Sequence, residues 1–124
     1  MFTINEEGLK VFEISRATWL RGEGSRASRL LRAPDFKMCC LGSFALAADY
    51  CKSTIMGLMQ PSELVGHGTI KNNFKWLFDG TGYPEKVLWE VMECNDDPDT
   101  DDEYKMAKLT EIFRAHGYLP VFVD

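Results

Sequence analysis

Two features are scarce in this sequence: histidine and long runs of apolar residues. Only two of the 124 residues are histidine. No stretch approaches the ~20 consecutive apolar residues that a membrane span requires, so we expect no transmembrane segment. The residues from Met1 to Glu7 lack a basic region followed by an apolar one, which is the pattern of a secretory signal. We therefore expect a cytoplasmic protein.

Several well-known site motifs are missing as well. The sequence has no Gly-x-Ser-x-Gly, no His-Glu-x-x-His and no carboxylate pair in a glycosidase pattern. Residues 22–25 form neither a phosphate-binding loop nor a dinucleotide fingerprint. A loop that begins at Asn95, Asp96 or Asp97 lacks the glycine at position 6 and the glutamate at position 12 of an EF-hand. We therefore expect a non-enzymatic protein without a cofactor or a bound metal.

The four cysteines have two interpretations, and the first is core packing. They are Cys39, Cys40, Cys51 and Cys94. In a reducing cytosol they stay thiols, and a free thiol usually behaves as a small buried hydrophobe. This predicts core positions for Cys39 or Cys40 and for Cys51. If the adjacent pair lies on a regular helix, one of its members is expected to be partly exposed.

A thiol- or metal-dependent protein is the second interpretation of the cysteines. A helix N-terminus lowers the pKa of a thiol, so Cys39 or Cys40 is a candidate nucleophile with His67 or His116 as its base. The cysteine spacing does not match a zinc knuckle or ribbon, because no Cys-x2-Cys pair exists. Cys94 precedes an acidic run that raises the pKa of its thiol, so we expect it to be inert.

Residues 38–51 predict a central core helix that the other elements surround. Small residues such as Gly42 and Ser43 leave little bulk around this helix, so neighbouring segments can approach it closely. One face has the i, i+3, i+4, i+7 and i+10 spacing of a helix and consists of Leu41, Phe44, Ala45, Ala48 and Cys51.

The remaining pattern predicts an α+β fold in a single domain, residues 1–124. Three main helices, at 38–51, 84–95 and 101–116, are expected to pack on a small, mostly antiparallel sheet. Strands at 10–14 and 118–123 are expected to be sheet neighbours, and the proline in the later strand indicates an edge position or the start of the strand.

Helix boundaries also have sequence signals. Pro84 suits the first residue of a helix. Thr100 and Glu103 have the spacing of a capping box, which predicts Thr100 as the N-cap of the last helix. Gly117 is expected to end that helix.

Charge is distributed unevenly along the chain. Residues 1–40 hold seven Lys or Arg against five Asp or Glu, whereas residues 41–124 hold seven against fourteen. The net acidity disfavours direct binding to nucleic acid, which requires a basic surface. Within the acidic part, the stretch Glu93–Glu103 has seven carboxylates in eleven residues.

Five aspartates of this acidic stretch are the first candidate binding residues. An acidic face can bind a basic surface of a partner protein, such as a groove that holds nucleic acid. The alternative is a solvated linker whose carboxylates favour the N-terminus of the following helix. The candidates are Asp96, Asp97, Asp99, Asp101 and Asp102.

A second candidate site lies in the first third of the chain. Arginine side chains can hold a phosphate, and a tryptophan can stack on a base. This combination predicts a protein that binds or sequesters a small phosphorylated ligand such as a nucleotide. In the alternative interpretation the tryptophan belongs to the core and the arginines pair with the acidic half. The residues are Trp19, Arg21, Arg26 and Arg29.

Scattered blocks of the sequence resemble a group of small uncharacterised proteins encoded by phages and prophages. The blocks are Trp19–Gly24, Ser28–Leu31, Lys37–Gly42, Cys94–Asp97 and Leu109–Gly117. The resemblance carries over no activity and no functional residue. It implies an accessory protein in the cytosol of an infected bacterial cell. Such a protein would bind a host protein, as inhibitors of host defence of the anti-CRISPR kind do.

Overall fold

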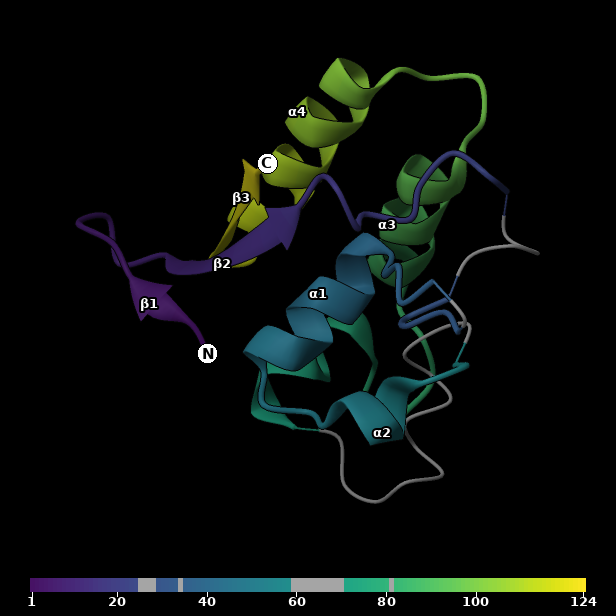
Figure 1. Ribbon diagram of the computed structural model, residues 1–124. Coiled ribbons are helices and arrows are strands. Elements are labelled where there is room, and N and C mark those ends of the chain that lie inside the picture. The colour runs from purple at the N-terminus through teal and green to yellow at the C-terminus, as the bar shows by residue number, and fades with distance from the viewer. Residues whose placement is uncertain (25–28, 34, 59–70, 81) are drawn as a thin grey trace.

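The computed structural model describes residues 1–24, 29–33, 35–58, 71–80 and 82–124, and its fold is α+β, as the sequence predicts (Figure 1). The strands are β1 (Thr3–Ile4), β2 (Lys10–Ser15) and β3 (Tyr118–Val123). The helices are α1 (Cys40–Ala47), α2 (Lys52–Ile55), the 3-10 helix η2 (Asn72–Leu77), α3 (Lys86–Asp96) and α4 (Asp102–Arg114). In the described part of the chain, no helix is both long and apolar enough to cross a membrane.

β2 is the central strand of a mixed three-stranded sheet in the order β1-β2-β3. The expected pairing of the N-terminal and C-terminal strands is confirmed. β1 pairs antiparallel with two residues of β2, whereas β3 pairs parallel with the whole strand Lys10–Ser15. The longer pairing is therefore parallel, although the sequence favoured a mostly antiparallel sheet. A long connection that contains helices separates β2 from β3, and such a crossover allows parallel strands where a hairpin does not.

The edge position predicted for the strand that contains Pro120 is also confirmed, because β3 is the last strand in the order of the sheet. The amide of Lys10 donates to Gly117 O at 3.0 Å, and the amide of Arg16 donates to Val123 O at 2.7 Å. Bonding residues alternate along a parallel pair, so Pro120 directs its backbone away from β2. Its missing N–H therefore costs the sheet no hydrogen bond.

α1 is shorter than the expected helix, and this changes the positions of its cysteines. The helix ends at Ala47 because Asp49 takes a left-handed conformation with φ of 69°. Cys51 therefore lies outside the predicted helical face and is exposed. Cys39 is the N-cap rather than a helical residue, so both it and Cys40 are buried. The predicted core position is thus confirmed for the adjacent pair and wrong for Cys51.

The core is built around Phe44 of α1, which confirms the central place of this helix. Its ring centroid lies 5.2 Å from that of Phe12 in β2, 5.0 Å from Phe74 in η2 and 5.4 Å from Phe113 in α4. All four side chains are buried. The aromatic cluster thereby joins the sheet, α1 and α4.

The helices α3 and α4 begin later than their sequence signals suggest. Pro84 lies in a β-bridge with Phe78, and Glu85 is the N-cap of α3. Asp101 rather than Thr100 caps α4, and its Oδ1 accepts from the amide of Tyr104 at 2.8 Å. The hydroxyl of Thr100 instead accepts a hydrogen bond from a buried lysine, Lys105.

Candidate functional site

Trp19 lies in the core, where Asn95 holds its indole. The side chain is only 2% exposed, and its Nε1 donates to Asn95 Oδ1 at 2.8 Å. The ring also packs against Phe122, with centroids 4.9 Å apart. A buried ring offers no face to a base, so the structure places Trp19 in the packing role and not in the predicted nucleotide-stacking role.

Asn95 joins three segments through its side-chain amide. Its Oδ1 also accepts from the amide of Cys40 at 3.1 Å. Its Nδ2 donates to Leu20 O at 3.0 Å and to Asp96 Oδ1 at 2.9 Å. The end of α3, the first turn of α1 and the segment around Trp19 are thus connected by one buried side chain.

Asp96 belongs to the same buried region and not to an exposed acidic face. Its side chain accepts from Asn95, its backbone carbonyl accepts from the amide of Gly24 at 2.9 Å, and the residue is 7% exposed. The prediction that Asp96 forms part of a binding surface is therefore not supported by its position. Its backbone carbonyl fixes the end of α3 to the segment around Gly24, and its carboxylate holds the side-chain amide of Asn95.

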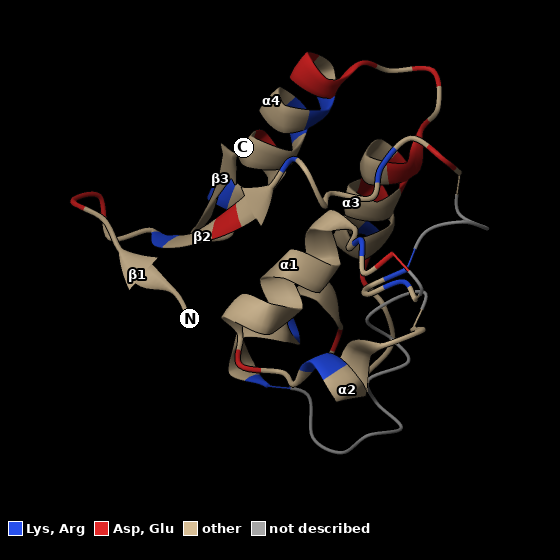
Figure 2. Ribbon diagram, viewed as in Figure 1, with Lys and Arg blue, Asp and Glu red and all other residues tan. Residues whose placement is uncertain are grey.

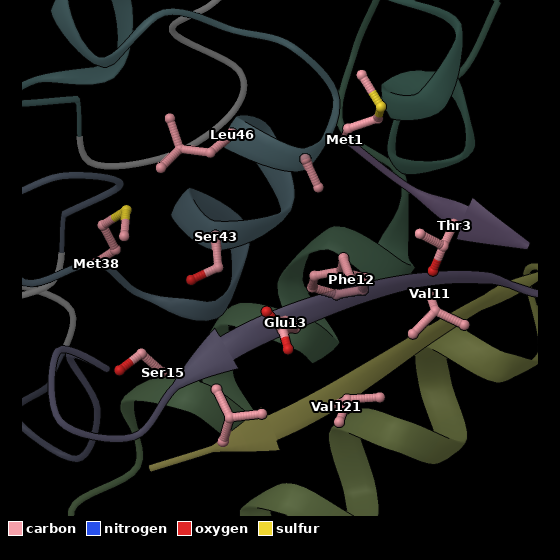
Figure 3. Close-up of a pocket in the computed structure, with 12 residues that line it drawn as sticks. Met1, Thr3, Val11, Phe12, Glu13, Ser15, Met38, Ser43, Leu46 and Val121 are labelled. Atoms are coloured by element: carbon pink, nitrogen blue, oxygen red, sulfur yellow. The ribbon is translucent and has the colours of Figure 1, made fainter.

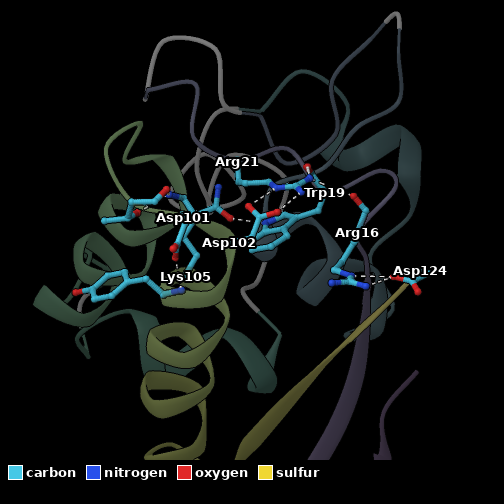
Figure 4. A network of polar contacts seen from close by, with 10 residues as sticks. Arg16, Trp19, Arg21, Asp101, Asp102, Lys105 and Asp124 are labelled. Atoms are coloured by element: carbon cyan, nitrogen blue, oxygen red, sulfur yellow. Dashed lines mark hydrogen bonds and ion pairs between the residues drawn. The ribbon is translucent and has the colours of Figure 1, made fainter.

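Arg21 and Asp102 form a bidentate ion pair that is half-buried (Figure 4). Arg21 Nε lies 3.0 Å from Asp102 Oδ1, and Nη2 lies 2.6 Å from Oδ2. The guanidinium also lies 4.8 Å from the centroid of the Trp19 ring. This hydrogen bonding holds the pKa of the Asp102 carboxyl below its usual value. For this pair, the alternative interpretation, in which arginines pair with the acidic half, agrees with the structure.

The buried Lys105 fixes the connection between α3 and α4 from inside. The residue is 1% exposed. Its Nζ donates to Asp97 O at 2.6 Å, to Thr100 O at 2.8 Å and to the Thr100 hydroxyl. These acceptors are neutral, so the ammonium serves as a three-way hydrogen-bond donor that ties the connection to α4.

Three aspartates of the predicted face remain on the outside of that connection. Asp99 and Asp101 are exposed and Asp97 is half-buried, and the neighbouring Glu103 is exposed. Figure 2 shows the acidic residues along the connection and over the first turn of α4. None of these four carboxylates takes part in an ion pair between described residues. The structure therefore keeps these three of the five predicted aspartates on one exposed segment.

Most residues of the second candidate site, the predicted nucleotide site in the first third of the chain, are not available to a ligand in the described structure. Arg26 lies outside the described residues. Arg29 is half-buried, and its backbone carbonyl accepts from the amide of Cys39 at 3.0 Å. Trp19 and Arg21 are engaged within the protein as described above. The described geometry therefore gives no support to a nucleotide site in this segment.

Two of the thiols, those of Cys40 and Cys94, do not have the environment of a nucleophile. Burial raises the pKa of the Cys40 thiol well above its ordinary value, although a helix N-terminus was expected to lower it. Burial also raises the pKa of Cys94, the direction expected from the sequence but with a different main cause. His116 is exposed and stacks on Trp76, with centroids 4.7 Å apart, and His67 lies outside the described residues.

A metal site is not apparent in the described part of the chain. No group of three or more His, Cys, Asp or Glu side chains lies close enough there to hold a metal ion.

A cavity of about 630 Å³ lies between α1 and the sheet (Figure 3). Met38, Ser43 and Leu46 line one side, and Val11 and Glu13 of β2 line the other. The lining is mostly apolar, with a few hydroxyl groups and one carboxylate. No sequence signal singled out this groove, because α1 and β2 are far apart in the chain.

Asn95 and Lys105 are not among the residues that the sequence predicted for a site, although each has a recognisable position. Asn95 continues the buried spacing of Leu88 and Val91 on α3, and Lys105 precedes Leu109 by one helical turn on the buried side of α4. A polar residue on the apolar stripe of a helix is the signal that could have found both.

Comparisons with protein-family models, with curated proteins and with solved structures find no match to this chain. Its function is therefore inferred from the geometry described above.

Proposed function

We propose that this protein acts without catalysis, by binding a basic surface of a partner protein through the connection between α3 and α4. The binding residues are Asp97, Asp99 and Asp101, together with Glu103 in the first turn of α4. Carboxylates attract and orient a positively charged surface, such as a groove in which a protein holds a nucleic-acid backbone. The resemblance to phage-encoded proteins favours a partner in a bacterial host, and an inhibitor of host defence fits that context.

The observation that carries this proposal is the buried Lys105. Exposed charges on a mobile loop lose conformational entropy when they bind, whereas preorganised charges lose less. Lys105 holds both Asp97 and Thr100 by their backbone carbonyls, so the segment that carries the acidic side chains has a fixed shape. The ion pair of Asp102 with Arg21 anchors its far end.

Charge reversal on the connection tests the proposal. Asp99→Lys with Glu103→Lys reverses two exposed charges that cap no helix and pair with no described cation. We expect this variant to lose a bacterial protein that the wild type retains from lysate at low salt. The retained protein should also be released from the wild type as ionic strength rises, because exposed charges are screened.

The matched control is Glu6→Lys with Glu90→Lys, which changes net charge equally at exposed positions outside the connection. It should retain the same protein as the wild type. If both double variants lose the protein equally, net charge alone explains retention and the proposed surface is wrong. If neither loses it, the connection is not the binding surface.

A further inference from the structure

One edge of β2 is uncovered over most of its length, because no strand of the described residues lies beside it there. β1 covers only Lys10 and Val11 on this side. On the other side, the amides of Lys10 and Arg16 donate to the backbone at the start and the end of β3. Bonding directions alternate along a strand, so even-numbered residues of β2 bond to β3 and odd-numbered residues face the opposite edge.

Glu13 is therefore the residue whose backbone N–H and C=O both lie on the uncovered edge. Val11 pairs with Thr3 of β1, and Ser15 O accepts from the amide of Thr18 at 3.2 Å. Among the described residues, the uncovered backbone groups of β2 are therefore the N–H and C=O of Glu13 and the N–H of Ser15. Unpaired backbone groups in a row are a template for another strand.

The cavity of Figure 3 lies beside this edge and provides side-chain contacts for such a strand. Leu46 and Met38 offer apolar surface on the α1 side. Ser43 is 8% exposed and lines the cavity, and no hydrogen bond to its hydroxyl is found among the described residues. This hydroxyl can both donate and accept, so it can bond to a polar backbone that enters the groove.

Glu13 also supplies the only charged side chain in the lining formed by the described residues. It is exposed and belongs to none of the ion pairs found between described residues. On a sheet, a residue directly opposite Glu13 would project to the same face as its carboxylate. A lysine or arginine at that position would be complementary in charge, and its aliphatic stem could pack on Val11, which projects to the same face of β2 as Glu13.

We propose that this groove binds an extended segment of a partner protein, which adds to β2 as a strand and places a lysine or arginine opposite Glu13. The residues on either side of this cation would face α1 and are expected to be apolar. Main-chain bonds to Glu13 and Ser15 would supply the general affinity, and the cation would supply the selectivity.

A second copy of this chain fits the groove less well. The uncovered backbone groups centre on Glu13, so a symmetric pairing of two β2 edges would bring two Glu13 side chains together. Like charges directly opposite each other on a sheet are destabilising. The charge of the groove therefore favours a different chain with a basic residue.

Amide NMR on the full-length protein tests the inference with two synthetic peptides. Both are acetylated and amidated: Thr-Val-Lys-Val-Thr, and the same peptide with Glu in place of Lys. We expect the lysine peptide, at millimolar concentration, to shift the amide signals of Glu13 and Ser15 and to slow their hydrogen exchange. The glutamate peptide should bind more weakly by roughly tenfold or more, because it opposes like charges.

Two variants identify the role of the carboxylate. Glu13→Gln should weaken binding of the lysine peptide by roughly 1.5-fold to fivefold, in line with an exposed ion pair. Glu6→Gln, an exposed position outside the groove, should leave it unchanged. Charge reversal at Asp99 and Glu103 should also leave it unchanged, so this result and the function proposed above can fail separately.

Four outcomes would overturn the inference. Slow exchange of the Glu13 amide in the free protein would mean that the edge is already covered. Equal binding of both peptides would exclude the cation contact, and the absence of shifts at Glu13 and Ser15 with either peptide would exclude the groove. Shifts that depend on protein concentration without peptide would identify a second copy as the occupant.

Discussion

At the scale of single residues, we expect replacement of Asn95 to cause the largest loss of stability. Asn95→Ala would leave the indole N–H of Trp19, the amide of Cys40 and the carbonyl of Leu20 without a partner in the core. Each unsatisfied buried group costs about 1–3 kcal/mol, and partial relaxation reduces the sum. We expect the free energy of unfolding to fall by about 3–5 kcal/mol, measured by urea denaturation.

Asn72→Ala is the matched control for this change. Asn72 is exposed at the start of η2, so its replacement should alter stability by no more than about 0.5 kcal/mol. A loss below about 1 kcal/mol for Asn95→Ala would show that water or a rearranged side chain satisfies the three groups.

Gly42 matters at the scale of elements, because it allows α1 to contact the segment before it. A Cβ built on Gly42 would lie 1.7 Å from the backbone oxygen of Leu30, a distance that requires the backbone to move. Alanine has the higher helix propensity by about 1 kcal/mol, but the clash outweighs this gain. We expect Gly42→Ala to lower the free energy of unfolding by at least about 2 kcal/mol.

The same substitution at Gly80 gives the comparison. A Cβ there would meet nothing within 4 Å, so Gly80→Ala should have little effect on chemical denaturation. Equal stability of the two alanine variants would contradict the close approach of Leu30 to α1.

The pair of Arg21 and Asp102 links another two elements, and its contribution depends on pH. The folded state lowers the pKa of Asp102, so the pair stabilises the protein above the ordinary carboxyl pKa of about 3.9. This stabilisation is lost as the pH falls through the lower pKa of the folded state. Asp102→Asn should therefore be less stable than the wild type at pH 7, and the difference should shrink by pH 3.

Thermal unfolding at several pH values measures this difference. Asp99→Asn is the control, because Asp99 is exposed and pairs with no described cation. Its difference from the wild type should change little with pH. A difference for Asp102→Asn that stays constant from pH 7 to pH 3 would mean that the ion pair contributes no net stability.

At the scale of the whole molecule, the α+β class and the three longer helices could be predicted because they follow apolar periodicity. Phe44 lies on the predicted apolar face of residues 38–51, and it is in the core. The close approach at Gly42 also followed from residue size. These features depend on local sequence, and local sequence is sufficient to specify them.

The features that could not be predicted depend on distant partners. The place of Lys105 on the apolar stripe of α4 indicates burial, but its acceptors, the carbonyls of Asp97 and Thr100, could not be predicted from that stripe. Asp96 and Trp19 were candidate binding residues by type, and their common partner Asn95 places them inside. The groove at Glu13 arises only when α1 lies beside β2.

The pairing of β2 with β3 has a consequence for how the protein is made. The contacts that close the sheet join positions about a hundred residues apart, such as Arg16 and Asp124. Contacts of such long range slow folding, because closing a long loop costs chain entropy before the contacts repay it. During synthesis β2 therefore cannot pair with β3 until residues 118–123 have left the ribosome. Until then its unpaired edges are exposed to other chains, and a chaperone that covers them would raise the yield of folded protein.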